Sequence, residues 1–398
     1  MVNLPPLAGV RLAAVKSHIR YPDRLDLVLI ELSSGAEVAG VFTGNAFSAA
    51  PVKLAKHHLL EGDIRYFLIN TGNANAGTGE AGYLDARRCC RAVAELAGVR
   101  IEQILPFSTG VIGEALPVER IEAGIPGVYG ALGEANWLLA AQGIMTTDTR
   151  PKTASVALDC GGKALTVNGI AKGAGMIKPN MATMLAFVFT DASVPQETLK
   201  TMLSGMVERS FNRITVDGDT STNDACMLVA TGEGEVDIAK AGDEERQLFE
   251  QALQDVFRTL ATEIIRDAEG GSKFVTIGIE GGRSSAECLQ VAYAIAESPL
   301  VKTALFASDP NWGRILAAIG RAGVTGLEVE RVMVRLGDVC LVKNGTLADD
   351  YTERRGKAEM QKSDIEINVD LGRGSHRETV WTSDLSLDYV RINAEYRS

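Results

Sequence analysis

The chain has 398 residues, of which 46% are hydrophobic and 23% charged, a composition typical of a globular protein with a substantial core. Its formal net charge is −11, and no block rich in lysine or arginine offsets the excess of acid. Because an acidic surface repels phosphate groups, nucleic acids and anionic membranes are poor candidates for partners. The sequence contains neither a recognisable signal peptide nor an apolar run near the roughly 20 residues that span a bilayer. We therefore expect a cytoplasmic protein, of about two or three domains by length alone.

The first half of the chain is predicted to form mainly short strands separated by glycine turns. Runs of apolar and β-branched residues that end in glycine or polar residues indicate these strands. The last two, joined by Gly161-Gly162, are typical of a hairpin. The predicted strands are Leu25–Leu32, Tyr66–Asn70, Ser155–Asp159 and Ala164–Asn168, and one helix is predicted over Gly82–Ala97.

The second half alternates between strands and helices. Leu185–Thr190 is a continuous apolar run that predicts a strand buried on both faces. Apolar residues at helical spacing predict a helix from Pro195 to about Arg209 and a longer one from Asp243 that ends at Gly270-Gly271. Further elements are predicted at Lys273–Ile279 (strand), Ser284–Ala296 (helix), Arg331–Leu336 (strand) and Val339–Val342 (strand). This irregular alternation favours mixed sheets covered by helices.

Several common chemistries lack support in the sequence. No spacing typical of a zinc site, a histidine-based triad or a P-loop occurs. The cysteines are predicted to be small buried residues in a reducing compartment, because none forms a C-x-x-C pair. The cysteines are Cys89, Cys90, Cys160, Cys226, Cys288 and Cys340, and the histidines, predicted to be surface or packed residues, are His18, His57, His58 and His376.

The segment Asp217–Asp224 begins like a calcium loop but departs from that pattern. Thr222 stands where the loop needs glycine, and Leu228 stands where it needs glutamate. We predict instead a polar turn in which aspartate and threonine side chains cap their own backbone, with a wall of an active site as a second interpretation. No metal site is expected.

The segment Lys172–Leu185 carries the most chemical information, and it reads KGAGMIKPNMATML. Its glycines allow close backbone approach, and its proline restricts the chain just before the predicted buried strand. Thr183 stands between this approach and the strand. If its hydroxyl attacks the Ala182 carbonyl, an N-to-O acyl shift followed by hydrolysis cuts the chain there. The freed α-amine, with a pKa of about 8, then serves as general base for the hydroxyl beside it.

The same segment resembles the processing segment of the ornithine acetyltransferases, also called glutamate N-acetyltransferases, of arginine biosynthesis. Other segments resemble this family in the same order along nearly the whole chain. They are Asn70–Gly77 (NTGNANAG), Ser108-Thr109-Gly110, Met145–Thr149 (MTTDT), Thr215–Asp224 (TVDGDTSTND), Asp309–Arg314 (DPNWGR) and Ile392–Ser398 (INAEYRS).

The resemblance implies a role for particular residues. Thr183 matches the nucleophile, Ala182–Thr183 the cleavage site, and Thr109 with Gly110 the pair that stabilises an oxyanion. The substrate contacts it implies are Thr146, Lys172, Thr183, Glu269, Asn393 and Ser398. Lys172 is suited to an α-carboxylate and Glu269 to an amino group. Ser398 replaces the threonine that this family often has, which keeps the hydroxyl. Asn73, Asn75 and Asn311 receive no catalytic role and are expected to shape polar turns.

The resemblance also implies a fold and a reaction. The fold is α/β, with mixed sheets sandwiched between helices in a four-layer αββα arrangement like that of self-cleaved enzymes with an N-terminal nucleophile. Fragments 1–182 and 183–398 share one interleaved core and assemble as a heterotetramer of two of each. Acetyl passes from N-acetylornithine to Thr183 and then to glutamate, without a bound cofactor. Acetyl-CoA is an additional candidate donor.

Two alternatives remain open from the sequence. One is a self-processing amidohydrolase or aminopeptidase of similar architecture, in which water removes the acyl group. The other is a non-enzymatic amino-acid-binding protein in which the glycine-rich segments are only turns.

Overall fold

The computed structural model describes residues 4–178 and 184–395, and the chain divides into two compact units. Unit 1 comprises Met1–Asn212 and Thr220–Ile264, and unit 2 comprises Arg213–Asp219 and Ile265–Ser398. The chain therefore passes from unit 1 to unit 2 and back before it enters unit 2 for good. Within the described ranges, no helix is both long and apolar enough to cross a membrane.

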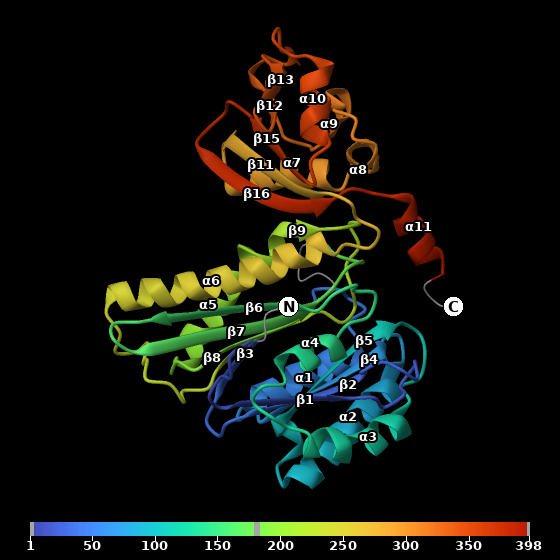
Figure 1. Cartoon of the computed structure of the whole chain (residues 1–398), viewed down its shortest axis with the longest axis vertical. Coiled ribbons are helices and arrows are strands. Elements are labelled where there is room, and N and C mark those ends of the chain that lie inside the picture. The colour runs from blue at the N-terminus through green and yellow to red at the C-terminus, as the bar shows by residue number, and fades with distance from the viewer. Residues whose placement is uncertain (1–3, 179–183, 396–398) are drawn as a thin grey trace. The chain divides into compact units, whose positions relative to one another are not determined.

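Two sheets form the centre of unit 1 (Figure 1). Sheet 1 has the order β1-β2-β4-β5, and sheet 2 has the order β3-β10-β8-β7-β6. Both sheets are mixed, because β4 and β5 run parallel in sheet 1 and β8 and β10 run parallel in sheet 2. Sheet 1 contains β1 (Val10–Val15), β2 (Leu27–Leu32), β4 (Tyr66–Asn73) and β5 (Ile104–Val111). Sheet 2 contains β3 (Glu37–Phe42), β6 (Lys152–Asp159), β7 (Ala164–Lys172), β8 (Leu185–Thr190) and β10 (Ala225–Ala230).

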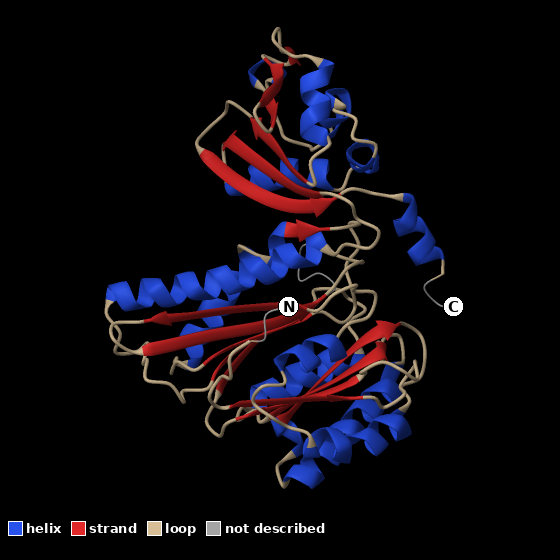
Figure 2. Cartoon of the chain, viewed as in Figure 1, coloured by secondary structure: helices blue, strands red, loops and turns tan. Residues whose placement is uncertain are grey.

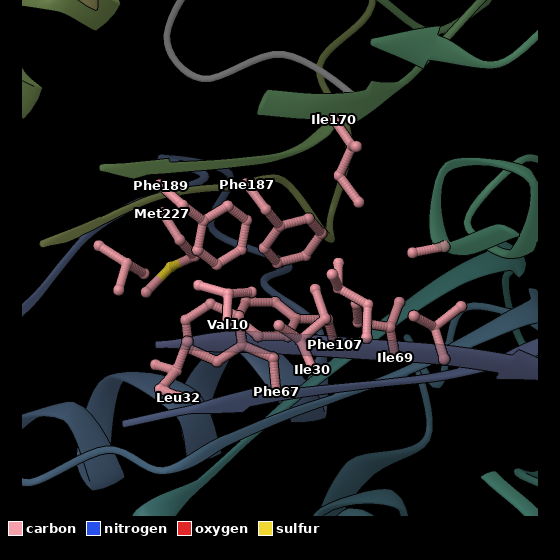
Figure 3. Packing of buried hydrophobic residues seen from close by; sticks show 14 of the residues in the cluster. Val10, Ile30, Leu32, Phe67, Ile69, Phe107, Ile170, Phe187, Phe189 and Met227 are labelled. Carbon is pink, nitrogen blue, oxygen red and sulfur yellow. The ribbon is translucent and has the colours of Figure 1, made fainter. Parts of the chain in front are cut away.

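The inner faces of the two sheets share one apolar core. Phe67 of sheet 1 lies with its ring centroid 5.7 Å from that of Phe187 in sheet 2, and Phe107 meets the same ring edge-on at 5.0 Å. Figure 3 shows these side chains from the two sheets pointing toward one another. Aromatic and aliphatic side chains from both sheets thus make up one packed apolar cluster.

Helices cover the two outer faces of unit 1. Helices α2 and α3 pack on sheet 1 through a second apolar cluster that includes Cys90, Val93 and Ile121. Helix α6 crosses sheet 2 so closely that a Cβ on Gly169 would lie 2.7 Å from Leu260. The predicted four-layer αββα arrangement is therefore confirmed in this unit (Figure 2). The helices of this part are α1 (Ala50–Glu61), α2 (Gly79–Ala97), α3 (Val118–Gly130), α4 (Trp137–Gly143), α5 (Gln196–Glu208) and α6 (Asp243–Arg266), the last of which continues into unit 2.

Unit 2 is built on a mixed sheet of order β14-β13-β12-β15-β11-β16-β9. Helices α7 and α9 pack with its central strands in one apolar cluster. The strands are β9 (Ile214–Thr215), β11 (Phe274–Gly282), β12 (Met333–Leu336), β13 (Val339–Lys343), β14 (Thr346–Leu347), β15 (Asp364–Asp370) and β16 (His376–Ser383). The helices are α7 (Ser285–Ala296), α8 (Pro299–Phe306), α9 (Trp312–Gly320), α10 (Glu353–Met360) and α11 (Leu387–Ala394).

Most predicted elements are confirmed within a few residues, and the Gly161-Gly162 hairpin joins β6 to β7 as predicted. The expectation that the first half is mainly strands was incomplete, because the unpredicted helices α1, α3 and α4 also lie there. Helix α3 was not predicted because it contains Pro126 and several glycines, which are unfavourable inside helices. All six cysteines are free, and five are buried as predicted, whereas Cys340 is partly exposed. His58 is packed, with its ring Nδ1 2.7 Å from the Ile104 carbonyl oxygen.

Asn311 of the DPNWGR segment caps a helix rather than shaping only a turn. Its side-chain oxygen accepts a hydrogen bond from the Arg314 amide at the start of α9, and its amide group donates to Asp309 Oδ2. We predict that Asn311→Ala lowers the free energy of unfolding by about 1 kcal/mol, because a first-turn N–H of α9 loses its partner. In a unit of this size that corresponds to a thermal midpoint about 2–4 °C lower, measured by calorimetry. Asn311→Asp is the control that keeps the cap, and an equal loss in both variants would contradict the capping role.

Candidate active site

Thr109 and Gly110 lie near the end of β5, where β4 runs beside them. Thr109 is paired with Thr71, and Gly110 with Gly72, so the NTGNANAG and STG segments are neighbours in sheet 1. Gly110 has a φ of +136°, and a Cβ there would lie 2.3 Å from the Gly72 carbonyl carbon. Only glycine fits this position, because both the conformation and the space exclude a side chain.

Lys172 of sheet 2 lies beside Thr109 of sheet 1. It is the last residue of β7, it is buried, and its ammonium group donates a hydrogen bond to Thr109 Oγ1 at 3.3 Å. Because the Thr109 oxygen accepts from the lysine, the hydroxyl hydrogen is directed to another acceptor. A donor polarised in this way suits a developing negative oxygen, which is the role that the resemblance implied for Thr109.

A buried carboxylate, Asp148, connects two of the predicted substrate contacts. Its Oδ2 accepts a hydrogen bond from the Thr146 amide at 2.9 Å, and its Oδ1 accepts one from the Gly173 amide at 2.8 Å. Lys152 donates to the same Oδ1 at 2.5 Å, with both side chains fully buried. Burial opposes ionisation, but the positive charges of Lys172 and Lys152 and the Gly173 N–H lower the pKa of Asp148 to about 2. Asp148 is therefore ionised at neutral pH.

The Asp217–Asp224 segment supports the site through its last two residues. The Asn223 side chain donates to the Ala74 carbonyl oxygen at 2.6 Å and to the Ser108 carbonyl oxygen at 2.9 Å. It therefore holds the loop after β4 and the residue before Thr109. The predicted self-capping is confirmed for Asp217, which accepts from the Asp219 amide. The second cap comes from Ser221, whose hydroxyl accepts from the Asn223 amide, rather than from a threonine.

Asn73 and Asn75 shape the loop after β4, as expected. The Asn73 side chain accepts from the Asn75 amide at 2.8 Å and donates to the Ala115 carbonyl oxygen at 3.0 Å. The Asn75 side chain donates to the Gly82 carbonyl oxygen, within α2. These contacts fix the neighbourhood of Gly110 but leave no role in the reaction itself.

Asp224 directly precedes β10, whose first residue, Ala225, is paired with Leu185 at the start of β8. Its Oδ1 accepts a hydrogen bond from the Met184 amide at 2.9 Å, and Oδ2 has no hydrogen-bond partner within the described part of the chain. Burial raises the pKa of Asp224 well above its ordinary value, although the Met184 N–H, the charge of Lys172 and the Ser221 hydroxyl each lower it. A buried acid with a strongly shifted pKa is typical of a functional site.

Two of the predicted substrate contacts, Glu269 and Asn393, lie together in unit 2. Asn393 of α11 donates to Glu269 Oε2 at 2.8 Å and to the Tyr389 carbonyl oxygen at 3.0 Å. Gly270 follows with a φ of +64°, and a Cβ there would lie 2.4 Å from the Tyr389 nitrogen. The Tyr389 hydroxyl donates to Asp217 Oδ2 at 3.1 Å. Glu269 is buried, and its carboxylate is bonded to α11 through Asn393.

The structure thus places the predicted residues in two groups. Thr109, Gly110, Thr146 and Lys172 gather in unit 1, and Glu269 with Asn393 in unit 2. Ala182, Thr183 and Ser398 lie outside the described residues. Sequence reasoning missed Asp148, Asn223 and Asp224 as individual residues. All three stand inside segments that carried the resemblance, which was the only signal for them.

We predict that Asp224→Asn makes unit 1 more stable at pH 7. An acid whose folded pKa is raised stays protonated where the unfolded chain, with a pKa of about 3.9, ionises. Stability therefore falls as pH rises above about 4, and the neutral amide removes this loss while its oxygen still accepts from Met184. Urea unfolding between pH 4 and pH 7, in a Thr183→Ala background, should show a gain that grows with pH. A gain independent of pH would contradict the assignment.

Comparison with known proteins places the chain in a family. The model of the ArgJ family matches residues 11–398. The arginine biosynthesis bifunctional protein ArgJ of Pseudomonas syringae pv. tomato is 53% identical over 398 residues, covering 99% of this chain and 98% of that protein. The protein of the same name from Methylococcus capsulatus is 52% identical over 397 residues, covering 100% and 97%.

A crystal structure of the Bacillus halodurans arginine biosynthesis bifunctional protein ArgJ is also similar. It shares 37% identity and covers 52% of this chain and 97% of that chain, with a TM-score of 0.49. The family match and the two full-length relatives exclude the non-enzymatic alternative. The chain belongs to the ArgJ family and is a bifunctional enzyme of arginine biosynthesis.

Proposed function

We propose that this enzyme moves acetyl from N-acetylornithine to glutamate through an acetyl ester on Thr183, giving ornithine and N-acetylglutamate. The observation that carries the proposal is the buried hydrogen bond from Lys172 to Thr109, beside Gly110. The bond polarises the Thr109 hydroxyl beside Gly110, a position with no room for a side chain. In the sequence, Lys172 begins the segment that ends at Thr183. Membership of the ArgJ family supports the reaction class.

The first step of the proposal is the release of Thr183. Its hydroxyl oxygen attacks the Ala182 carbonyl carbon, the C–N bond breaks, and the acyl group moves from nitrogen to oxygen. Water then cleaves the ester, which leaves a carboxylate on Ala182 and a free α-amine on Thr183. The fragments are 1–182 and 183–398. Their interleaving is supported by sheet 2, in which β3, β6 and β7 precede the cut while β8 and β10 follow it.

The second step is acyl transfer by double displacement. The Thr183 hydroxyl attacks the acetyl carbonyl and gives its proton to the neighbouring α-amine, which has a pKa of about 8 when unperturbed. Thr109 and the Gly110 N–H stabilise the oxyanion of the tetrahedral intermediate. The protonated amine then donates to the leaving nitrogen of ornithine. Glutamate attacks the ester in the same way, and its amine nitrogen takes the acetyl group.

In this proposal particular residues contact the substrates. Lys172 pairs with an α-carboxylate, Thr146 and Ser398 supply polar contacts, and Glu269, oriented by Asn393, receives an amino group. Acetyl-CoA serves as a second possible donor for glutamate. The reaction requires no metal or bound cofactor, because Thr183 provides both nucleophile and base. We further propose a cytoplasmic heterotetramer of two copies of each fragment.

We predict that the purified wild-type protein consists of two fragments, the second beginning at Thr183. Thr183→Ala should remain one chain without transferase activity, because neither the acyl shift nor the ester can form. Intact-mass analysis and N-terminal sequencing measure the cut, and ornithine release from N-acetylornithine measures the activity. An active wild-type enzyme that stays in one piece would contradict the processing step. Release of ornithine that does not depend on glutamate would favour the amidohydrolase alternative.

We predict that Thr109→Ala lowers kcat about 10²- to 10³-fold, the usual cost of one oxyanion donor, while KM changes little. The Thr109→Ala variant should still fold. Its self-cleavage should be slow enough for the rate of the cut to be measured. Thr231→Ala is the matched control, since Thr231 is another buried threonine of unit 1 whose hydroxyl donates to the Ala8 carbonyl oxygen. Equal kcat values in the two variants would mean that the oxyanion assignment is wrong.

A further inference from the structure

The carboxylate of Asp148 makes several hydrogen bonds, and none of the roles assigned above explains them. Each of its oxygens accepts a main-chain N–H, from Thr146 and from Gly173, and Oδ1 also accepts from the Lys152 ammonium. Thr146 and Asp148 belong to the same short loop after α4, whereas Gly173 follows Lys172 at the end of β7. One carboxylate therefore joins a loop to a strand end that are far apart in the sequence.

The ion pair itself does not explain why a charge is buried here. Both side chains of the Asp148–Lys152 pair are fully buried. Removing two charges from water costs about as much as their attraction returns, so apolar residues of the same volume often stabilise a core equally well. A buried pair that adds little stability needs another reason to be present. The two main-chain contacts supply that reason, because an apolar residue cannot accept them.

We propose that Asp148 is a positioning residue, which fixes Lys172 and Thr146 in one geometry for recognition of the substrate carboxylate. This inference rests on the proposed function, in which both residues contact substrate. The Gly173 amide bonded to Asp148 directly follows Lys172, so that bond holds the main chain from which the Lys172 side chain extends. Lys152 neutralises the carboxylate from β6, where it is paired with Ala171, the residue before Lys172.

Asp148 and Lys152 offer variants that separate positioning from stability. In Asp148→Asn, only one side-chain oxygen remains, so the new NH₂ group faces one of the two amides and that contact is lost. Lys152→Met breaks the same ion pair but leaves both main-chain contacts in place. The double variant Asp148→Asn with Lys152→Met removes both charges, and so avoids an unpaired buried ion.

Steady-state kinetics with N-acetylornithine and glutamate, together with thermal unfolding, test the proposal. Asp148→Asn should raise KM for the amino-acid substrates about 10- to 100-fold, as expected for a lost hydrogen bond to a charged group, with a smaller change in kcat. Lys152→Met should lower the unfolding midpoint but keep KM within about twofold, because no contact to Thr146 or Gly173 is lost. The double variant should recover the midpoint and retain the raised KM.

The outcomes distinguish this inference from the proposed function. If the double variant recovers KM together with the midpoint, Asp148 has only a structural role and the inference is overturned. A wild-type KM in Asp148→Asn, in an enzyme that is cut and active, overturns it as well while the proposed function stands. An uncut wild-type chain, or one without glutamate-dependent transfer, overturns the proposed function and this inference with it.

Discussion

The burial of both faces of strand β8 is the constraint on which the rest of unit 1 depends. Every residue of β8 is buried, and so is every residue of its parallel neighbour β10. Phe187 and Phe189 point into the core between the sheets, and Gly169 on the neighbouring strand lies against Val188 and Leu260 on the outer side. A strand with two covered faces requires a packed layer on each side, here sheet 1 on one side and α6 on the other. It also fixes the start of β8, so that the residue before it, Met184, enters the interior at a defined point.

Several buried polar and charged side chains of unit 1 lie at the ends of its strands. Lys172, Asp148 and Asp224 are all buried, yet each has main-chain or side-chain partners that the strand ends provide. Main-chain N–H groups at the strand ends are free to bind side chains, whereas those in the middle of the sheets are hydrogen-bonded to neighbouring strands. A charged group held by fixed amides, as Asp148 is, does not have to reorganise when charge develops nearby, which is the electrostatic advantage of an enzyme interior over water.

The sequence predicted the fold where one physical signal was strong. Leu185–Thr190 is continuously apolar and became β8 with the same bounds, and the helical spacing after Asp243 became α6. The prediction missed segments in which the signals were mixed, and it also missed the continuously apolar β10 and the alternating β15. In β16 (HRETVWTS), polar side chains interrupt the apolar pattern, and α8, α10 and α11 are too short for a clear period. Tertiary packing decides such segments.

Some residues of the site could be predicted from the sequence, and others could be found only from the structure. The resemblance supplied Thr109, Gly110 and Lys172, and the structure added the contact between Lys172 and Thr109. Asp148 could not be recognised from sequence, because its partners are an amide two residues before it, a lysine four residues after it and an amide at position 173. A lone aspartate in MTTDT gives no sign that it is buried. Its role depends on which strand end folds against the loop.

Sheet 2 contains strands from both proposed fragments, and this has a consequence for assembly. Strands β8 and β10 lie between β3 and β7, so in the proposed enzyme the second fragment is hydrogen-bonded to the first on both sides. Folding before the cut is a one-chain process, but recovery after denaturation would require two chains to meet and exchange long-range pairings. The lifetime of the mature enzyme is then set by how slowly it unfolds rather than by an equilibrium. Backbone scission would therefore make maturation a one-way event.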